Sequence, residues 1–287
     1  MRSVLTQGAP GTAVAVVIFF AGASVASFAT LAAYRLPRGL SVVRPGSLCP
    51  LCGKPLGLWA KIPVVSYLAL RGRCAMCGGP IGVRHLVAEL GLGAAAVYLF
   101  WAFPASSALA RFVLVSALLV CSLVDYDWRL IPNAVTMPGM VVGVAAGSWM
   151  MPEVGWKESL IGLGVGAGVL YLTGEAYRLV RRREGVGLGD VFLTGMAGAF
   201  LGWRGAFFTL VAGSLLGTLF GLIFAFARAP QPGSEETAET AVPASGSSTP
   251  SAASILGTEL PFGPFLSLAA GWYALFGPLM GAKGLWQ

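Results

Sequence analysis

Long apolar stretches recur along this chain of 287 residues, and they constrain its fold more than any other feature. A helix needs about 20 mostly apolar residues to cross the hydrocarbon core of a bilayer. Because 56% of the residues are hydrophobic and only 11% are charged, the chain is not an ordinary soluble domain. We predict an all-α, polytopic membrane protein with about eight transmembrane helices, at 13–33, 86–103, 107–124, 134–151, 159–177, 190–202, 205–227 and 262–281.

Basic residues predict how these helices are oriented. Arg35 and Arg38 follow the first apolar run and only Arg2 precedes it, which favours an uncleaved helix with its N-terminus outside. In this orientation 14 of the 19 Lys and Arg residues lie on the cytoplasmic side. The net charge of +7 therefore reflects membrane orientation. We expect a multi-pass protein of the cytoplasmic membrane that has the lipid bilayer, and no nucleic acid, as a partner.

Four of the five cysteines lie in the largest polar insertion between two predicted helices. They form two Cys-x-x-Cys pairs, Cys49 with Cys52 and Cys74 with Cys77, separated by 21 residues. Two such pairs that face each other supply the tetrahedral four-thiolate shell that zinc prefers. Two disulfides are disfavoured in the reducing cytosol, and a redox dithiol would not need two matched pairs. The pattern predicts a structural zinc site, because four thiolates leave no open coordination position.

Acidic residues at the ends of membrane helices are candidates for function, since ionisable groups are rare there. Asp125 ends the third predicted helix and Asp190 begins the sixth, and the predicted topology brings both to the cytoplasmic face. Two close carboxylates share one proton and can activate a water molecule against a peptide carbonyl. The alternatives are that Asp190 only caps a helix and that Asp125 and Asp127 are loop residues beside Arg129. A transporter with carboxylate ion sites ranks last, because such sites lie near the membrane midplane.

With these motifs in place, the chain resembles the type IV prepilin peptidase family. The stretches RLPRGLSVVRPGSLCPLCGKPL and KIPVVSYLALRGRCAMCGGPIGVRH resemble its cytoplasmic zinc domain, and DYDWRLIPN and GLGD resemble its two aspartate motifs. The resemblance implies that Asp125, seven residues before Pro132, and Asp190, which ends GLGD, are the catalytic aspartates. It also implies cleavage of a basic leader from prepilins or type II secretion pseudopilins at the cytoplasmic face of a bacterial inner membrane. Many members also methylate the new N-terminus with S-adenosylmethionine, for which the sequence assigns no binding residues.

Five positions depart from the family pattern. Phe192 replaces a usual lysine, Thr30 and Lys61 replace usual asparagines, and His85 and Leu86 replace a usual tyrosine and proline. Phe192 motivates an alternative function, a catalytically altered membrane scaffold or assembly factor that retains the zinc domain. His85 is the only histidine, and we expect it at an interface or in solvent because four cysteines already complete the metal shell.

The motifs and apolar runs together predict five regions. They are a first transmembrane helix with its N-terminus outside, 1–33; a cytoplasmic four-cysteine zinc domain, 34–85; a transmembrane catalytic core, 86–228; a flexible cytoplasmic linker rich in Ser, Thr, Pro and Ala, 229–258; and a last transmembrane helix with the C-terminus, 259–287.

Overall fold

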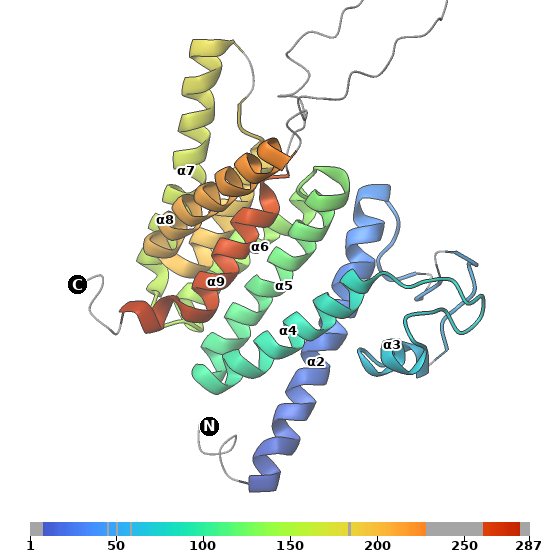
Figure 1. The fold of residues 1–287 in the computed structure, drawn as a ribbon. Helices are drawn as coiled ribbons and strands as arrows, with labels where there is room; N and C mark the ends of the chain where they lie inside the picture. Colours follow the sequence, from blue (N-terminus) through green and yellow to red (C-terminus); the bar gives the residue numbers. More distant parts are fainter. Residues whose placement is uncertain are drawn as a thin grey trace, which may run out of the picture.

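A computed structural model describes residues 8–44, 46–49, 51–57, 59–182, 185–227 and 261–281 (Figure 1). Within these ranges the chain is helical and contains no β-strand. The helices are α2 (Gly8–Arg35), η1 (Leu36–Arg38), η2 (Trp59–Lys61), α3 (Val65–Ala69), α4 (Val83–Ala102), α5 (Ala105–Trp128), α6 (Asn133–Trp149), α7 (Gly155–Arg181), α8 (Leu188–Ala227) and α9 (Gly263–Gly281). The predicted linker at 229–258 lies outside the described residues.

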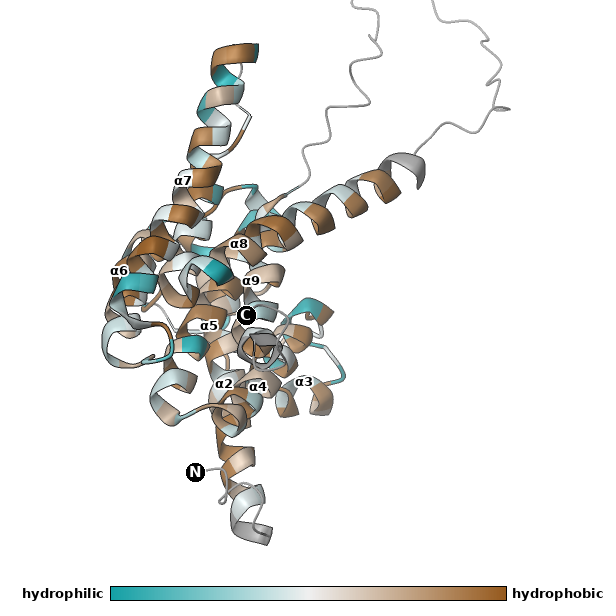
Figure 2. Cartoon of the chain, turned by 90° about the vertical axis from the view of Figure 1, so that its left-hand side faces the viewer, coloured by the Kyte–Doolittle hydropathy of each residue, from teal (hydrophilic) through white to brown (hydrophobic). Residues whose placement is uncertain are grey.

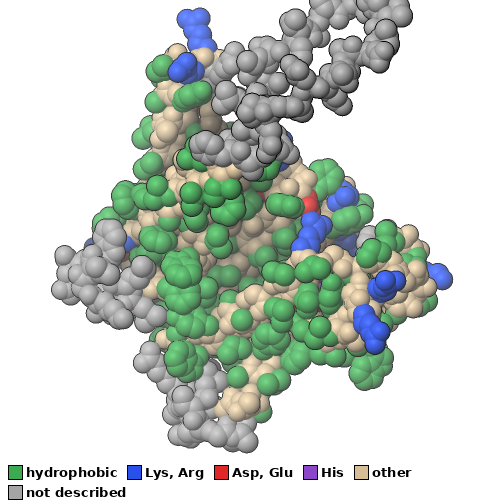
Figure 3. Space-filling model, viewed as in Figure 1, with side chains coloured by type: hydrophobic (Ala, Val, Ile, Leu, Met, Phe, Trp, Pro, Cys, Tyr) green, Lys and Arg blue, Asp and Glu red, His purple; other side chains and the backbone are tan. Residues whose placement is uncertain are grey.

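Five of the described helices, α2, α4, α5, α7 and α8, are long and apolar enough to cross a membrane. Hydrophobic residues recur along the helices (Figure 2), and hydrophobic side chains cover much of the visible surface of the bundle (Figure 3). Val17 and Leu172, for example, are 68% and 67% exposed. Large apolar side chains in such positions are stable when lipid covers them. The prediction of an all-α polytopic membrane protein is confirmed.

The long helix α8 is broken at Gly202, where φ is 71° and the backbone leaves the helical region. Gly198 packs against Ala206: a Cβ atom added at Gly198 would lie 3.1 Å from the Cβ atom of Ala206. In a continuous helix these residues would be about 12 Å apart along the axis. The chain therefore reverses at Gly202, and the 40 residues of α8 form two helices, as the separate spans predicted at 190–202 and 205–227 require.

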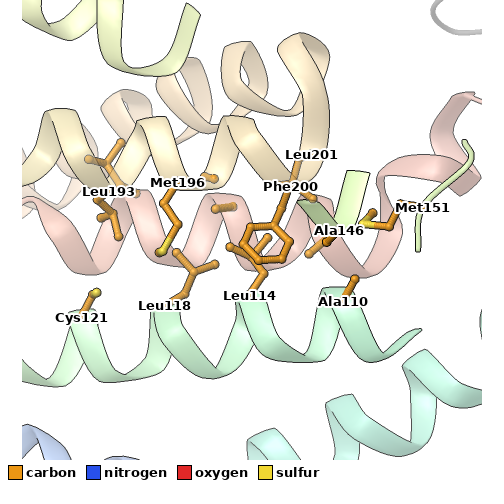
Figure 4. Packing of buried hydrophobic residues seen from close by; sticks show 14 of the residues in the cluster. Ala110, Leu114, Leu118, Cys121, Ala146, Met151, Leu193, Met196, Phe200 and Leu201 are labelled. Carbon is orange, nitrogen blue, oxygen red and sulfur yellow. The ribbon is translucent and has the colours of Figure 1, made fainter. Parts of the chain in front are cut away.

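The main core lies between α5, α6, α8 and α9. Leu114 and Leu118 of α5 face Met196 and Phe200 of α8, and all four side chains are almost fully buried (Figure 4). Leu266 of α9 belongs to the same cluster. This core fixes the relative positions of α5, which carries Asp125, and α8, which carries Asp190.

Helices α7 and α8 pack through glycines, which bring their backbones together. A side chain at Gly162 or at Gly166 would collide with the α8 backbone, at Gly198 and Thr194 respectively. The Thr194 hydroxyl donates a hydrogen bond of 2.9 Å to the Gly166 carbonyl. Gly164, by contrast, has open space beside it. This small-residue spacing of four is typical of close helix contacts in membranes.

Helix α9 is attached to α5 at two points. The amide of its first residue, Gly263, donates to the Asp125 carboxyl, and about three turns later the Ala274 carbonyl accepts a hydrogen bond of 2.8 Å from the Arg111 guanidinium. Arg111 is only 2% exposed, and its charge is balanced by Glu153 at 3.4 Å. A buried arginine is stable when it is paired and hydrogen-bonded in this way. The last helix is therefore fixed against the helix that carries Asp125.

Helices α2 and α4 pack closely through Gly22 and Gly93. The cysteine-containing segment between them, with the short helix α3, lies beside these two helices (Figure 1). It projects from the bundle on the side away from α7 and α8.

Candidate functional site

The two Cys-x-x-Cys pairs adopt the same local structure. In the first, the Cys49 amide donates to the Lys54 carbonyl, and in the second the Cys74 amide donates to the Gly79 carbonyl. Each turn closes at a glycine with positive φ, which is 68° at Gly53 and 69° at Gly78. Residues with side chains rarely adopt this conformation, so the glycine after each second cysteine is needed for the turn.

The four thiols of these turns converge. Their sulfur atoms all lie within 4.8 Å of one another, and Cys49 Sγ and Cys77 Sγ are 3.9 Å apart. A zinc ion with four Zn–S bonds of about 2.3 Å would place its sulfurs about 3.8 Å apart. All four cysteines are free thiols, as is Cys121, which lies in α5 away from this cluster. Cys49, Cys52, Cys74 and Cys77 therefore form a group that can hold a metal ion.

The electrostatics of the cluster also suit a cation. A hydrogen bond from the Gly79 backbone lowers the pKa of the Cys77 thiol, but desolvation and the three neighbouring thiols raise that pKa overall to about 11. Thiols crowded in this way resist ionisation because the resulting thiolates would repel one another. A bound metal cation would favour the thiolates, since its charge stabilises the deprotonated form.

Asp125 and Asp190 line the same cavity, which has a volume of about 410 Å³. Asp125 lies in the last turn of α5 and is buried, and Asp190 lies in the first turn of α8 and is half-buried. Arg129 follows the last residue of α5, and its positive φ of 53° ends the helix and turns the chain away. The rest of the lining is Arg129, Leu130, Ile131, Asn133, Gly187, Leu188, Gly189, Phe192, Pro261 and Phe262.

Small residues allow the three elements around this cavity to approach one another. A Cβ atom added at Gly189 would lie 2.9 Å from the Ile131 side chain, and one added at Gly263 would lie 3.2 Å from it. Ile131 therefore lies between the start of α8 and the start of α9. The Asp125 Oδ2 atom accepts a hydrogen bond of 2.9 Å from the Gly263 amide. The segment Pro261–Gly263 was not among the residues that the sequence marked as candidates, although Pro and Gly at the start of a helix are a recognisable signal.

Asp127, two residues after Asp125, has a different partner. Its carboxylate forms an ion pair of 2.5 Å with Arg84, at the start of α4. The neighbouring Trp128 ring lies 4.6 Å from the guanidinium of Arg38, which follows α2. These contacts join the end of α5 to both ends of the cysteine-containing segment.

A second cavity, of about 810 Å³, lies between α2, α4 and the cysteine-containing segment. Glu89 is 2% exposed at its wall, and its carboxylate accepts hydrogen bonds from the Val64 amide at 2.7 Å and from His85 Nε2 at 3.0 Å. The other ring nitrogen of His85 contacts the Thr30 hydroxyl at 2.9 Å. Thr30, Lys61 and His85, three of the positions that depart from the family pattern, therefore line one cavity. His85 lies outside the cysteine cluster.

The strained backbone at Val64 belongs to this same contact. Its φ is 63°, a value that β-branched residues rarely adopt. The hydrogen bond to Glu89 holds it there and attaches the cysteine-containing segment to α4.

Comparison with known proteins gives two family matches. Residues 20–103 match the Bacterial Peptidase A24 N-terminal domain, and residues 112–222 match the Type IV leader peptidase family. The prepilin leader peptidase/N-methyltransferase of Pseudomonas putida is 32% identical over 280 residues, covering 88% of this chain and 87% of the relative. Those of Myxococcus xanthus and Pseudomonas aeruginosa are 36% and 34% identical, covering 76% and 82% of this chain and 65% and 72% of their own lengths. No solved structure matches the chain.

Proposed function

Because the chain belongs to the type IV leader peptidase family, we propose that it is a membrane aspartic endopeptidase that removes the basic leader from type IV prepilins or type II secretion pseudopilins. The observation that carries this proposal is the shared cavity of Asp125 and Asp190 at the ends of two apolar helices. The same arrangement argues against a catalytically altered scaffold, because the cavity keeps both carboxylates although Phe192 lines it.

In the proposed mechanism the two carboxyl groups carry one proton between them. The ionised carboxylate removes a proton from a water molecule, and the water oxygen attacks the scissile carbonyl carbon. The protonated carboxyl gives its proton to the carbonyl oxygen. When the tetrahedral intermediate collapses, the C–N bond breaks and the departing nitrogen takes the proton from the first carboxyl. The second carboxyl recovers its proton from the product, so the pair returns to its starting state.

The proposed location is the inner membrane of a bacterium, with the aspartate cavity at the cytoplasmic face. The distribution of Lys and Arg supports this orientation, since most of these residues lie on the side of the cysteine segment. The proposed regions are those predicted from the sequence: 1–33, 34–85, 86–228, 229–258 and 259–287. In this division the aspartates belong to the transmembrane catalytic core.

We propose zinc as the metal of the cysteine cluster and assign it a structural role. Four converging thiols and the S–S distance of 3.9 Å support a tetrahedral site. When bound, the ion crosslinks the two cysteine turns. The four cysteines are its proposed ligands, and no catalytic step involves it.

A second proposed activity is methylation of the new N-terminus with S-adenosylmethionine, which the names of the relatives support. The cavity of about 810 Å³ has room for a nucleoside ligand and has aromatic and apolar residues such as Phe28 and Tyr34 in its wall. The cofactor would supply the methyl group when bound. Mass spectrometry of the mature N-terminus of a co-expressed prepilin, with and without this protein, reports cleavage and methylation together.

Replacement of the aspartates tests the peptidase proposal directly. We expect Asp125→Ala and Asp190→Ala each to abolish leader removal from a co-expressed prepilin, while the proteins still accumulate in the membrane. Asp127→Ala is the matched control: it removes an exposed ion pair with Arg84 and should leave cleavage within about threefold of wild type. Normal processing by either of the first two variants contradicts the assignment. If a host that makes the wild-type protein removes no more leader from the prepilin than an empty host does, the result favours the scaffold alternative.

A further inference from the structure

The start of α9 makes a direct contact with one of the two proposed catalytic residues. The Gly263 amide donates a hydrogen bond of 2.9 Å to Asp125 Oδ2, and this contact is buried. A Cβ atom at position 263 would lie 2.7 Å from the same oxygen and 3.1 Å from the carboxyl carbon. Real Cβ atoms essentially never come as close to another atom as 2.7 Å. The absence of a side chain at Gly263 is therefore what allows the amide to reach the carboxylate.

The two carboxyls of the cavity are surrounded differently. Within the described parts of the chain, the side chain of Asp190 receives no hydrogen bond, whereas Asp125 receives the one from Gly263. A backbone amide at a helix N-terminus stabilises the ionised form of a carboxylate, because both the hydrogen bond and the helix dipole favour negative charge.

The charged groups around Asp125 come from several elements. Asp190 faces it from α8 and Arg129 follows it at the end of α5. From the α4 side, Arg84 is engaged by Asp127, and from the α2 side Arg38 lies over a tryptophan ring. Helix α9 contributes no charged side chain, and α6 contributes the uncharged Asn133 to the cavity. The Cys121 thiol lies one turn earlier in α5 and is buried.

We propose that Gly263 is a positioning residue that holds Asp125 as the ionised member of the pair, which leaves the shared proton on Asp190. This inference rests on the proposed peptidase function and deepens it. Asp125 then removes the proton from the attacking water, and Asp190 protonates the carbonyl oxygen of the substrate. On collapse Asp125 gives its proton to the departing nitrogen, and Asp190 recovers one from the product hydroxyl. The hydrogen bond occupies Oδ2 of Asp125 and leaves Oδ1 for the water.

Two substitutions at position 263 separate crowding from the loss of the hydrogen bond. Gly263→Ala keeps the amide but places a methyl group against Asp125. Gly263→Pro also removes the N–H donor, and it suits the first residue of a helix, where proline is favoured. Gly271→Ala in the same helix is the matched control, because nothing lies within 4 Å of a side chain there. Cleavage of a purified prepilin by the full-length protein in detergent is measured as kcat and KM across pH, per folded molecule.

We expect both Gly263 variants to lose about tenfold or more in kcat with KM nearly unchanged, because displacing a reacting group by an ångström is enough for this loss. Gly271→Ala should match wild type. The acidic limb of the pH profile should move by about half a unit or more to higher pH in Gly263→Pro, and less in Gly263→Ala, because a carboxylate without its N–H donor takes up a proton more readily. A residue that only supports the fold would lower the amount of folded protein without moving this limb.

Three outcomes decide the inference. If wild type cleaves and both Gly263 variants keep its kcat and pH profile, Gly263 does not position Asp125. If the proline variant does not accumulate, the alanine variant alone decides, and an unchanged kcat there overturns the inference. If wild type itself cleaves no prepilin, the proposed function fails first, which is a distinct result.

Discussion

At the scale of single residues, the buried charges of Glu89 and Arg111 are each matched to specific partners. Glu89 binds the Val64 amide and His85, and Arg111 binds Glu153 and the carbonyl of Ala274. An unpaired charge in a low-dielectric interior is costly, so these groups determine which segments can pack together. Glu89 fixes the cysteine-containing segment to α4 in this way.

Replacement of Glu89 should therefore destabilise the protein. Glu89→Leu leaves the half-buried Val64 amide without its acceptor and His85 without its carboxylate, which costs about 1–3 kcal/mol. The midpoint of thermal unfolding in detergent measures the loss. Glu175→Leu is the control, since Glu175 pairs with Arg178 in a largely exposed contact of 2.8 Å and its loss should cost less than about 1 kcal/mol. Equal losses in the two variants would contradict the role assigned to Glu89.

At the scale of helices, the contact between α7 and α8 determines where Asp190 lies. Gly162 and Gly166 let the two backbones touch. The Gly166 carbonyl accepts a hydrogen bond from the hydroxyl of Thr194, which lies one turn after Asp190 in α8. In lipid no hydrophobic effect drives two apolar helices together, so such close contacts supply the packing energy.

This contact predicts opposite effects for two glycines on the same helix. Gly166→Ala should push α8 away, because the new methyl group collides with the Thr194 backbone, and should cost about 1–3 kcal/mol and lower cleavage. Gly168→Ala has open space beside it and should be neutral or stabilising by up to about 1 kcal/mol. Unfolding midpoints and cleavage rates of the two variants check both statements. A tolerated Gly166→Ala would mean that the helices can separate without loss.

The sequence predicted the helices well because a membrane helix needs a long apolar run, which is a local property. The two cysteine turns were predictable for the same reason, since each lies within a few residues. By contrast, the Gly263 amide reaches Asp125 across 138 positions of the chain, and the Val64 amide reaches Glu89 across 25. Contacts of this kind depend on how the helices pack, and neither glycine nor valine carries a chemical signal of its role. The proposed catalytic pair was partly predictable. The predicted topology put Asp125 and Asp190 at the same face of the membrane, but that they line one cavity is visible only in the folded structure.

At the scale of the whole molecule, the cysteine-containing segment and the aspartate cavity are separate sites joined by a few contacts. Arg84 binds Asp127, and Arg38 lies over Trp128, close to the end of α5. A change in the shape of the cysteine segment can therefore reach the last turn of the helix that carries Asp125.

Metal analysis tests the cysteine cluster in the intact protein. We expect about one zinc ion per chain, as four thiolates bind a single ion. Cys49→Ser should lose the metal, and Cys121→Ser should keep it, since Cys121 is buried in α5 outside the cluster. Chelation should expose four thiols to alkylation and weaken the Arg84–Asp127 contact. Purified protein without metal, with all four thiols freely alkylated, would rule out the site.

The break at Gly202 has a consequence for how the proposed active site is enclosed. The part of α8 that carries Asp190 has only 14 residues before the break, which is about 21 Å of helix against a hydrocarbon layer of about 30 Å. From Val191 to Gly202 every residue except Phe192 is buried, so protein and not lipid surrounds this short helix. Because it is too short to reach both surfaces of the membrane, at least one of its ends lies at a depth where only neighbouring protein can satisfy the free backbone groups. The packing around α8, rather than the bilayer, therefore sets the polarity of the surroundings of Asp190.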